Sequence, residues 1–292
     1  MPIVLSGRPP FSLAAVVNSH GWIQLAPFRP AGDGGFSYAA RLAQGRVLEL
    51  VVAPRPDGVS VDTAEPISAG EEAEIAGMVR WMVGLDQDLA AFYAAVRDEP
   101  KLARAAAEAK GRILRSATLF EDTVKTILTT NTLWAATRRM VAALADLYGD
   151  PLPTDPARRA FPTPERLAAV GAEALRRDAR LGYRASYVAA LAHDVASGRL
   201  DLEALKNSGL ETPELRRRLL GIRGVGPYAA ANLLMLLAHY DYIPADSWAA
   251  RVVSREFFAG AAVTPADIER TFAPWGRWKG LAYWFWQWDE HQ

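Results

Sequence analysis

The stretch Leu219-Leu-Gly-Ile-Arg-Gly-Val-Gly-Pro-Tyr-Ala-Ala-Ala-Asn-Leu233 decides how most of this chain is interpreted. It has the pattern of a helix end, a glycine hairpin and a second helix that starts near Pro227, since glycine suits tight turns and proline suits a first helical turn. Gly221, Gly224 and Gly226 leave the hairpin without side chains. A phosphate can then approach the backbone N–H groups at the start of the second helix. The hairpin is therefore predicted to bind nucleic-acid backbone.

The sequence around the hairpin excludes other glycine-rich loops. A dinucleotide-binding loop follows a strand, whereas Pro213 to Leu220 has a charged helical pattern, and no Gly-Lys-Ser/Thr follows as a nucleotide P-loop requires. An ordinary packing corner between two helices stays an alternative for the glycines alone. Twenty residues after Gly226, the segment Pro244-Ala-Asp246-Ser-Trp places a carboxylate at a third predicted helix start. This carboxylate favours a functional site.

Three further segments accompany the hairpin in a defined order. They are a helix and turn at Phe120-Glu-Asp-Thr-Val-Lys-Thr-Ile-Leu-Thr-Thr-Asn131, then Leu181-Gly-Tyr-Arg-Ala-Ser-Tyr187, and finally Ile243-Pro-Ala-Asp246. With the hairpin, these segments resemble the helix-hairpin-helix (HhH-GPD) base-excision DNA glycosylases, in particular the 3-methyladenine DNA glycosylase II and 8-oxoguanine DNA glycosylase branches. The resemblance runs from about Arg112 to the C-terminus and is weak in the N-terminal third.

The expected fold class is α+β. Short β-rich runs between about Phe11 and Ile67, among them Trp22–Leu25 and Arg46–Val52, predict an antiparallel sheet. Helical periodicity dominates the remainder. We therefore expect an N-terminal antiparallel β-rich domain at 1–85, followed by a two-lobed all-helical body at 86–292. The resemblance implies that the cleft between the two lobes of that body is the active site.

Composition narrows the classes of function. At 292 residues the chain can bury a sizeable core. It contains no cysteine, which excludes disulfides, cysteine-based zinc sites and an iron–sulfur cluster. No apolar stretch has the length of a membrane span, and the N-terminus lacks the pattern of a signal peptide. We expect a cytoplasmic protein without a membrane partner, associated with the nucleoid if its source is bacterial.

The net charge of zero is unusual for a DNA-binding protein, because affinity for duplex DNA comes largely from neutralising phosphates. The charges are unevenly distributed. Residues 101–225 have 21 Lys/Arg against 14 Asp/Glu, whereas residues 1–100 have 7 against 12 and residues 226–292 have 5 against 7. The positive excess thus coincides with most of the predicted DNA-binding motifs. The resemblance implies that the partner is double-stranded DNA with a damaged base and that the protein is a monomer.

Asp246 is the candidate catalytic residue. Ahead of an amphipathic segment, an isolated aspartate also fits a helix N-cap. The resemblance places Asp246 at the position of the family's catalytic aspartate. A buried carboxylate there would stabilise the positive charge that develops on the sugar as an N-glycosidic bond breaks, or would activate the attacking water. Capping and catalysis are compatible.

Tyr228 occupies the position at which bifunctional members of the family have a nucleophilic lysine. A phenol forms no Schiff base with the sugar C1′, so lysine-dependent AP lyase activity is not expected. Its ring instead suits stacking on a cationic alkylated base, with a role in the core as the alternative. The family's last helix lines the base pocket, which makes Tyr283 and Gln287, one turn apart on a predicted helix, further candidates for base contacts.

Asn131 and Leu133 lie at the turn that, in the family, enters the DNA and fills the space left by the everted nucleotide. The alkylation branch usually has an apolar residue there, so Asn131 favours the 8-oxoguanine branch, and Leu133 is the alternative plug. Asn131 also fits the cap of a helix that starts near Thr132. Arg184 is expected to bind a DNA phosphate, with an ordinary surface arginine as the alternative.

The resemblance also implies a Na⁺ or K⁺ ion bound to the hairpin. Its ligands would be the main-chain carbonyls of Leu220, Ile222 and Val225.

These observations predict a monofunctional DNA glycosylase that flips a damaged purine and hydrolyses its N-glycosidic bond without an organic cofactor. Alkylated purines such as 3-methyladenine carry a positive charge and leave readily, so a carboxylate and aromatic walls suffice to remove them. Two alternatives stay open: an 8-oxoguanine-type glycosylase of the same fold, and a non-catalytic protein that binds damaged DNA.

Overall fold

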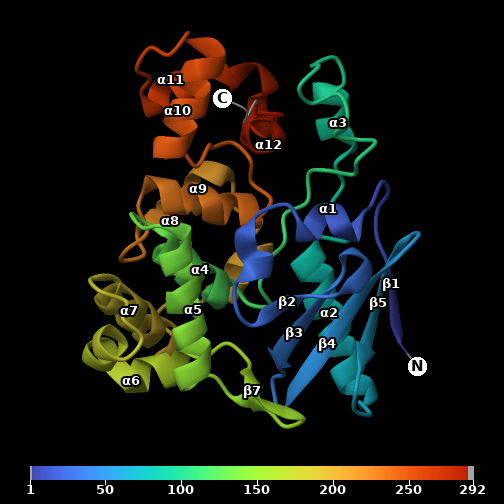
Figure 1. The fold of residues 1–292 in the computed structure, drawn as a ribbon, viewed down its shortest axis with the longest axis vertical. Helices are drawn as coiled ribbons and strands as arrows, with labels where there is room; N and C mark the ends of the chain where they lie inside the picture. The colour runs from blue at the N-terminus through green and yellow to red at the C-terminus, as the bar shows by residue number, and fades with distance from the viewer. Residues whose placement is uncertain (1, 289–292) are drawn as a thin grey trace. The chain divides into compact units, whose positions relative to one another are not determined.

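A computed structural model describes residues 2–288 (Figure 1), and the chain divides into two compact units. The sheet unit comprises Met1–Gln87 and Arg112–Ser208, and the hairpin unit comprises Asp88–Gly111 and Gly209–Gln292. This division differs from the one expected from the sequence, in which residue 85 separates a β-rich domain from a helical body. Part of the helical body belongs to the same compact unit as the sheet.

The sheet unit contains a five-stranded antiparallel sheet with the strand order β1-β5-β4-β3-β2 (Figure 1). Its strands are β1 (Ile3–Ser6), β2 (Phe28–Pro30), β3 (Phe36–Arg41), β4 (Val47–Arg55) and β5 (Gly58–Thr63). The predicted antiparallel sheet is confirmed. The run Trp22–Leu25, expected to be β-rich, instead forms most of a short 3₁₀ helix, η1 (Gly21–Gln24), with Leu25 as its C-cap. In this helix the Trp22 indole donates a hydrogen bond to the Asp122 carboxylate over 2.7 Å, so a tertiary contact accompanies the departure from the expected strand.

Helices complete the sheet unit. Two precede residue 112: α1 (Leu13–Val17), which contacts β4, and α2 (Ala69–Val83), which contacts β1. The remaining elements are α4 (Leu119–Thr129), α5 (Trp134–Tyr148), a small hairpin of β6 (Pro151–Leu152) and β7 (Asp155–Arg159), α6 (Pro164–Arg177), α7 (Arg184–Ala196) and the 3₁₀ helices η2 (Gly32–Gly34) and η3 (Glu203–Asn207).

Buried polar contacts explain why α4 and β7 belong with the sheet. The Tyr38 hydroxyl of β3 donates to the Glu121 carboxylate of α4 over 2.6 Å. Arg158 of β7 donates to the main-chain carbonyl of Pro27 over 3.0 Å and pairs with Glu49 of β4. Because buried polar groups are costly without partners, separating these elements would expose or orphan each of them.

The hairpin unit is helical among the described residues. It contains α3 (Ala90–Val96), α8 (Thr212–Leu220), α9 (Pro227–Leu236), α10 (Ser247–Phe257), α11 (Pro265–Thr271), η4 (Ala273–Trp278) and α12 (Lys279–Phe285). Although α3 is distant in sequence, it packs on η4, where the rings of Phe92 and Trp278 lie 5.8 Å apart. Gly280, the second residue of α12, lies against the main-chain carbonyl of Tyr240, and a Cβ at position 280 would approach that oxygen to 2.7 Å. Within residues 2–288, none of the helices combines the length and the apolar character needed to cross a membrane.

Candidate active site

The glycine hairpin has the geometry expected from its sequence. α8 ends at Leu220 and α9 begins at Pro227. Gly224 has a φ of 93°, a left-handed conformation that glycine adopts without a steric penalty. Gly226 is the N-cap of α9, has no side chain to cap the helix, and faces open space where a Cβ would stand. The first N–H groups of α9 are therefore accessible at the N-terminus of the helix, where an anion can bind them.

The carbonyl groups expected to hold a cation lie on this hairpin. The Ile222 carbonyl accepts a hydrogen bond from the Val225 N–H over 3.0 Å, which closes the turn. A carbonyl oxygen has a second lone pair, so this bond is compatible with an ion ligand. The cation site formed by Leu220, Ile222 and Val225 stays a prediction.

Asp246 is the N-cap of α10. One carboxylate oxygen accepts a hydrogen bond from the Ala249 N–H over 2.8 Å, and the backbone of Asp246 is extended. The cap anticipated from the sequence is therefore present, but the side chain is exposed in this structure, whereas the sequence hypothesis required a buried carboxylate. Its position at the helix start accounts for the exposure, because a cap lies outside the packed face of its helix.

Aromatic rings lie close to this carboxylate. Tyr283 is buried, and its burial, the negative charge of Asp246 and then Tyr228 raise the pKa of its hydroxyl above the usual value. Tyr283 therefore remains a neutral hydrogen-bond donor at physiological pH. Its ring lies 6.5 Å from that of Trp248 and 5.6 Å from that of Trp288, both in edge-to-face geometry. Two predicted site residues, Tyr228 and Tyr283, are thus brought together with Asp246.

Tyr228 also lines a cavity of about 410 Å³ within the hairpin unit. Ala245, the residue before Asp246, lines the same cavity, as does Tyr242. The Arg216 guanidinium lies 4.6 Å from the Tyr242 ring centre, so these two lining residues form a cation–π contact in the cavity wall. Tyr228 is half-buried at this wall, so it is not enclosed in a core.

The turn between α4 and α5 presents an apolar tip. The Leu133 side chain is 81% exposed, more than that of any other large hydrophobic residue described. Leu133 is the N-cap of α5, which starts at Trp134, so the alternative that Asn131 caps this helix is wrong. Asn131 is exposed and adopts a left-handed φ of 46°, which asparagine tolerates better than most residues. Both candidate wedge residues therefore project from one tight turn.

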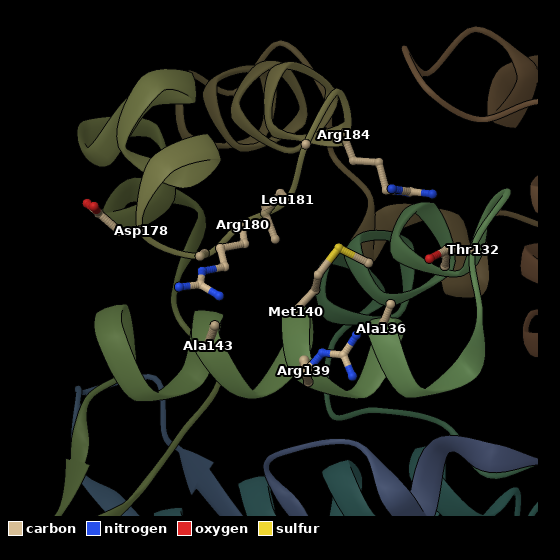
Figure 2. A pocket seen from close by; sticks show the side chains of 11 residues that line it. Thr132, Ala136, Arg139, Met140, Ala143, Asp178, Arg180, Leu181 and Arg184 are labelled. Carbon is tan, nitrogen blue, oxygen red and sulfur yellow. The ribbon is translucent and has the colours of Figure 1, made fainter.

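Arg184 holds this turn in place. Its side chain is nearly buried, with 7% exposed, and its guanidinium donates to the main-chain carbonyls of Thr130, over 3.1 Å, and of Asn131, over 3.0 Å. The side chain extends from the start of α7 towards the segment that contains Thr132 (Figure 2). This arrangement differs from the phosphate contact expected from the sequence, because two of the guanidinium nitrogens, Nε and Nη2, donate within the protein.

A match to a family model accompanies this geometry. Residues 124–277, more than half of the chain, match the model of the HhH-GPD superfamily base excision DNA repair protein. The chain belongs to the HhH-GPD superfamily. The matched range includes the wedge turn, the hairpin and Asp246, and it contains the motifs that suggested the resemblance except for the first residues of the one that begins at Phe120.

Two curated proteins resemble this HhH-GPD chain over part of their length. DNA-3-methyladenine glycosylase 2 of Escherichia coli is 29% identical over 184 residues, which are 59% of this chain and 60% of that protein. The N-glycosylase/DNA lyase of Saccharomyces cerevisiae is 24% identical over 149 residues, which are 47% of this chain and 40% of that protein. The chain thus spans less than two thirds of either relative.

One solved structure shows that the fold similarity extends further. The 3-methyladenine DNA-glycosylase from Archaeoglobus fulgidus matches with a TM-score of 0.75 over 96% of both chains, at 20% sequence identity. At this identity the likeness concerns the fold alone. It includes the N-terminal sheet, where the sequence resemblance is weak, and it confirms the α+β fold expected for an HhH-GPD protein.

Gln287 does not have the position expected for it. α12 ends at Phe285, and Trp286 leaves the helix with a ψ of 134°. The Trp286 ring packs 5.4 Å from Phe272, and the Gln287 N–H donates to the Lys101 carbonyl over 3.3 Å. Gln287 is exposed beyond the helix, so its predicted place one turn after Tyr283 is wrong. Aromatic packing of Trp286 ends the helix early.

Trp248 is a site residue that the sequence analysis missed. It follows Asp246 by two residues, is 36% exposed, and contacts both Tyr283 and Trp288 through its ring. Its proximity to Asp246 in the sequence was the available signal. Its contacts with residues 35 and more positions later depend on how α10 and α12 pack, which no local pattern reveals.

Proposed function

We propose that this HhH-GPD protein is a monofunctional DNA N-glycosylase that removes damaged purines, most simply alkylated ones, from double-stranded DNA. The observation that supports this proposal best is the placement of Asp246 beside Tyr228, Tyr283 and Trp248, at the start of the helix that follows α9. A carboxylate and aromatic rings are the groups that cleavage of a cationic base requires. Pure phosphate binding would gain nothing from a carboxylate that faces DNA.

The residues suggest a division of labour. The hairpin N-terminus of α9 binds the DNA backbone, and Leu133 fills the space that an everted nucleotide leaves. Trp248 and Tyr228 stack on the everted base, whose positive charge is attracted to the faces of electron-rich rings. Asp246 stabilises the positive charge that develops on the sugar, or accepts a proton from the attacking water.

The chemistry needs no organic cofactor, because hydrolysis consumes only water. Tyr228 stands where a nucleophilic lysine would form a Schiff base, so the product is an intact strand with an abasic site. We also propose that the protein acts as a monomer and that Na⁺ or K⁺ binds at the hairpin carbonyls.

An 8-oxoguanine-type glycosylase is the second candidate. Asn131, exposed on the wedge turn, favours it, because an amide can hydrogen-bond the base that loses its partner. The tyrosine at position 228 opposes any accompanying lysine-dependent strand cleavage.

Single-turnover incubation tests the proposal directly. Duplexes with 7-methylguanine, hypoxanthine or 8-oxoguanine are treated with an excess of protein, and each sample is divided between gels with and without alkali. We expect strand breaks for the alkylated duplex after alkali only. Breaks without alkali would show lyase chemistry and contradict the assignment of Tyr228, whereas release of 8-oxoguanine alone would favour the second candidate.

Truncation of the wedge should slow base release from fully paired DNA. Leu133→Ala removes most of an exposed apolar tip, so less of the cost of flipping, a few kcal/mol, is offset. We expect base release to slow about 5- to 30-fold, which corresponds to roughly 1–2 kcal/mol. The loss should shrink when the lesion lies in an unpaired bubble.

Leu147→Ala provides the matched control. Leu147 is a half-exposed leucine of α5, 50% accessible, and it lies near the opposite end of the helix from the wedge. Equal losses on paired and bubble substrates, or an equal loss for Leu147→Ala, would contradict the role of Leu133 as a plug.

A further inference from the structure

A second cavity, of about 450 Å³, opens in the sheet unit beside the wedge turn (Figure 2). α5 forms one wall, and the segment that joins α6 to α7 forms the other. Thr132 of the wedge turn lines the cavity, as do three arginines, Arg139, Arg180 and Arg184. Arg139 comes from α5, whereas Arg180 and Arg184 come from the stretch that leads into α7, so the fold brings positive charge from two segments to one opening.

Two of these arginines have no hydrogen-bond or ion-pair partner among the described residues. Arg184 donates to the turn carbonyls, but Arg139 and Arg180 are exposed and form no hydrogen bond or ion pair with any residue between 2 and 288. The acidic residue of the lining, Asp178, accepts two hydrogen bonds from Arg177, of 2.7 and 2.8 Å. In Figure 2 the Asp178 carboxylate points away from both guanidinium groups. The positive charge at the cavity is therefore not neutralised from within.

The backbone presents Arg180 in an unfavourable conformation. Arg180 has a φ of 56° and Gly182 a φ of 61°, with the fully buried Leu181 between them. A left-handed conformation costs a non-glycine residue about 1–2 kcal/mol, so the surrounding structure has to impose it. Burial of Leu181 anchors the segment and leaves the Arg180 side chain over α5, at the cavity (Figure 2).

We propose that Arg139 and Arg180 bind a DNA phosphate beside the everted nucleotide, at a site separate from the hairpin. Guanidinium groups bind phosphate oxygens through two parallel hydrogen bonds, and two of them at one open cavity suit a phosphodiester. This proposal rests on the proposed function, in which the wedge turn enters the duplex. Because Thr132 of that turn lines the cavity, DNA backbone within one or two nucleotides of the wedge passes over its rim.

The salt dependence of binding tests the site. Dissociation constants are measured between 50 and 200 mM KCl for a duplex with a stable abasic analogue, using wild type, Arg139→Ala, Arg180→Ala and the double variant. Each phosphate contact contributes about 0.9 to the slope of log K against log salt. We expect the double variant to lose about one unit of slope and to bind roughly 10-fold more weakly at 100 mM salt.

Arg138→Ala is the matched control. Arg138 neighbours Arg139 on α5, is exposed and equally without an ion pair among the described residues, but does not line the cavity. We expect it to change the slope little. An equal change for Arg138→Ala would indicate a general charge effect and would overturn the proposal, as would an unchanged slope in the double variant.

Further measurements separate the site from its rivals. Phosphates carry no sequence information, so a loss of affinity that varied with the base opposite the lesion would indicate a base contact and contradict the proposal. Calorimetric titration with inorganic phosphate alone, if it showed binding that the double variant lost while the DNA slope stayed unchanged, would assign the cavity to a free anion instead.

The test also remains informative if the proposed function fails. A wild-type protein that binds the duplex with the expected slope but releases no base would refute the glycosylase proposal and leave the phosphate site supported. If the wild-type protein released base but the double variant had an unaltered slope, the phosphate site would be refuted and the glycosylase proposal would remain supported.

Discussion

Replacing Asp246 by asparagine should slow base release by about 100- to 1,000-fold and leave the fold intact. The loss is of the size that follows when one preorganised electrostatic group is removed from a transition state. Asparagine is as good a helix N-cap as aspartate, so it can still accept the hydrogen bond from the Ala249 N–H. The substitution therefore removes the charge at the site and retains the cap of α10.

The measurement is the single-turnover rate at saturating protein, with thermal unfolding of both proteins recorded alongside. Asp267→Asn is the control, because Asp267 also accepts a hydrogen bond at a helix start, from the Thr264 N–H over 2.8 Å, but belongs to α11. We expect normal base release from the control. A rate within a few-fold of wild type in Asp246→Asn would refute the catalytic role. If the variant were destabilised in thermal unfolding as well as slow in base release, the helix cap alone would account for the effect of Asp246.

The features that the sequence predicted correctly are local ones. The helix ends and the hairpin from Leu219 to Leu233 follow from glycine and proline positions, because these residues restrict the backbone through their own chemistry. The cap by Asp246 follows from the same kind of rule. Asp246 and Tyr228 were related to a shared site through the order of motifs, and their electrostatic proximity to Tyr283 agrees with that grouping.

The features that the sequence analysis missed depend on contacts between distant segments. Trp22 was expected in a β-rich run, but a hydrogen bond to Asp122, one hundred positions away, accompanies its 3₁₀ helix. Arg184 was expected at a phosphate, but it donates to carbonyls 53 and 54 positions earlier. Propensity at each position is weak compared with such tertiary contacts. The arginines Arg139 and Arg180 line one cavity for the same reason.

Helix α4 shows this limit most clearly. Its sequence contains Glu121, Asp122 and Lys125, which would ordinarily predict a solvated face, yet all three side chains are buried. Lys125 donates to the Glu121 carboxylate over 2.6 Å and to the Ser116 hydroxyl over 3.2 Å. Its ammonium group lies 4.9 Å from the centre of the Phe28 ring. The sheet unit shields these charged side chains from solvent, and the sequence of α4 alone does not reveal that packing.

Breaking this pair should produce the largest loss of stability. Lys125→Met leaves the Glu121 carboxylate buried with the Tyr38 hydroxyl as its remaining side-chain partner among the described residues. Removal of one partner from a buried ion pair costs about 3–5 kcal/mol, because the other charge stays desolvated without compensation. We expect a comparable fall in the free energy of unfolding, measured by urea denaturation with circular dichroism.

The double variant Glu121→Gln/Lys125→Met decides whether the cost comes from the orphaned charge. It removes both charges and keeps similar side-chain volumes, and buried ion pairs replaced in this way are often neutral in stability. We expect the double variant to be more stable than Lys125→Met, since the two substitutions are coupled through one contact. The single variant Glu121→Gln completes the comparison. If the stability losses of Glu121→Gln and Lys125→Met simply added up to the loss of the double variant, the ion pair would contribute no coupling. Packing of the lysine stem against Phe28 would then account for the effect of Lys125→Met.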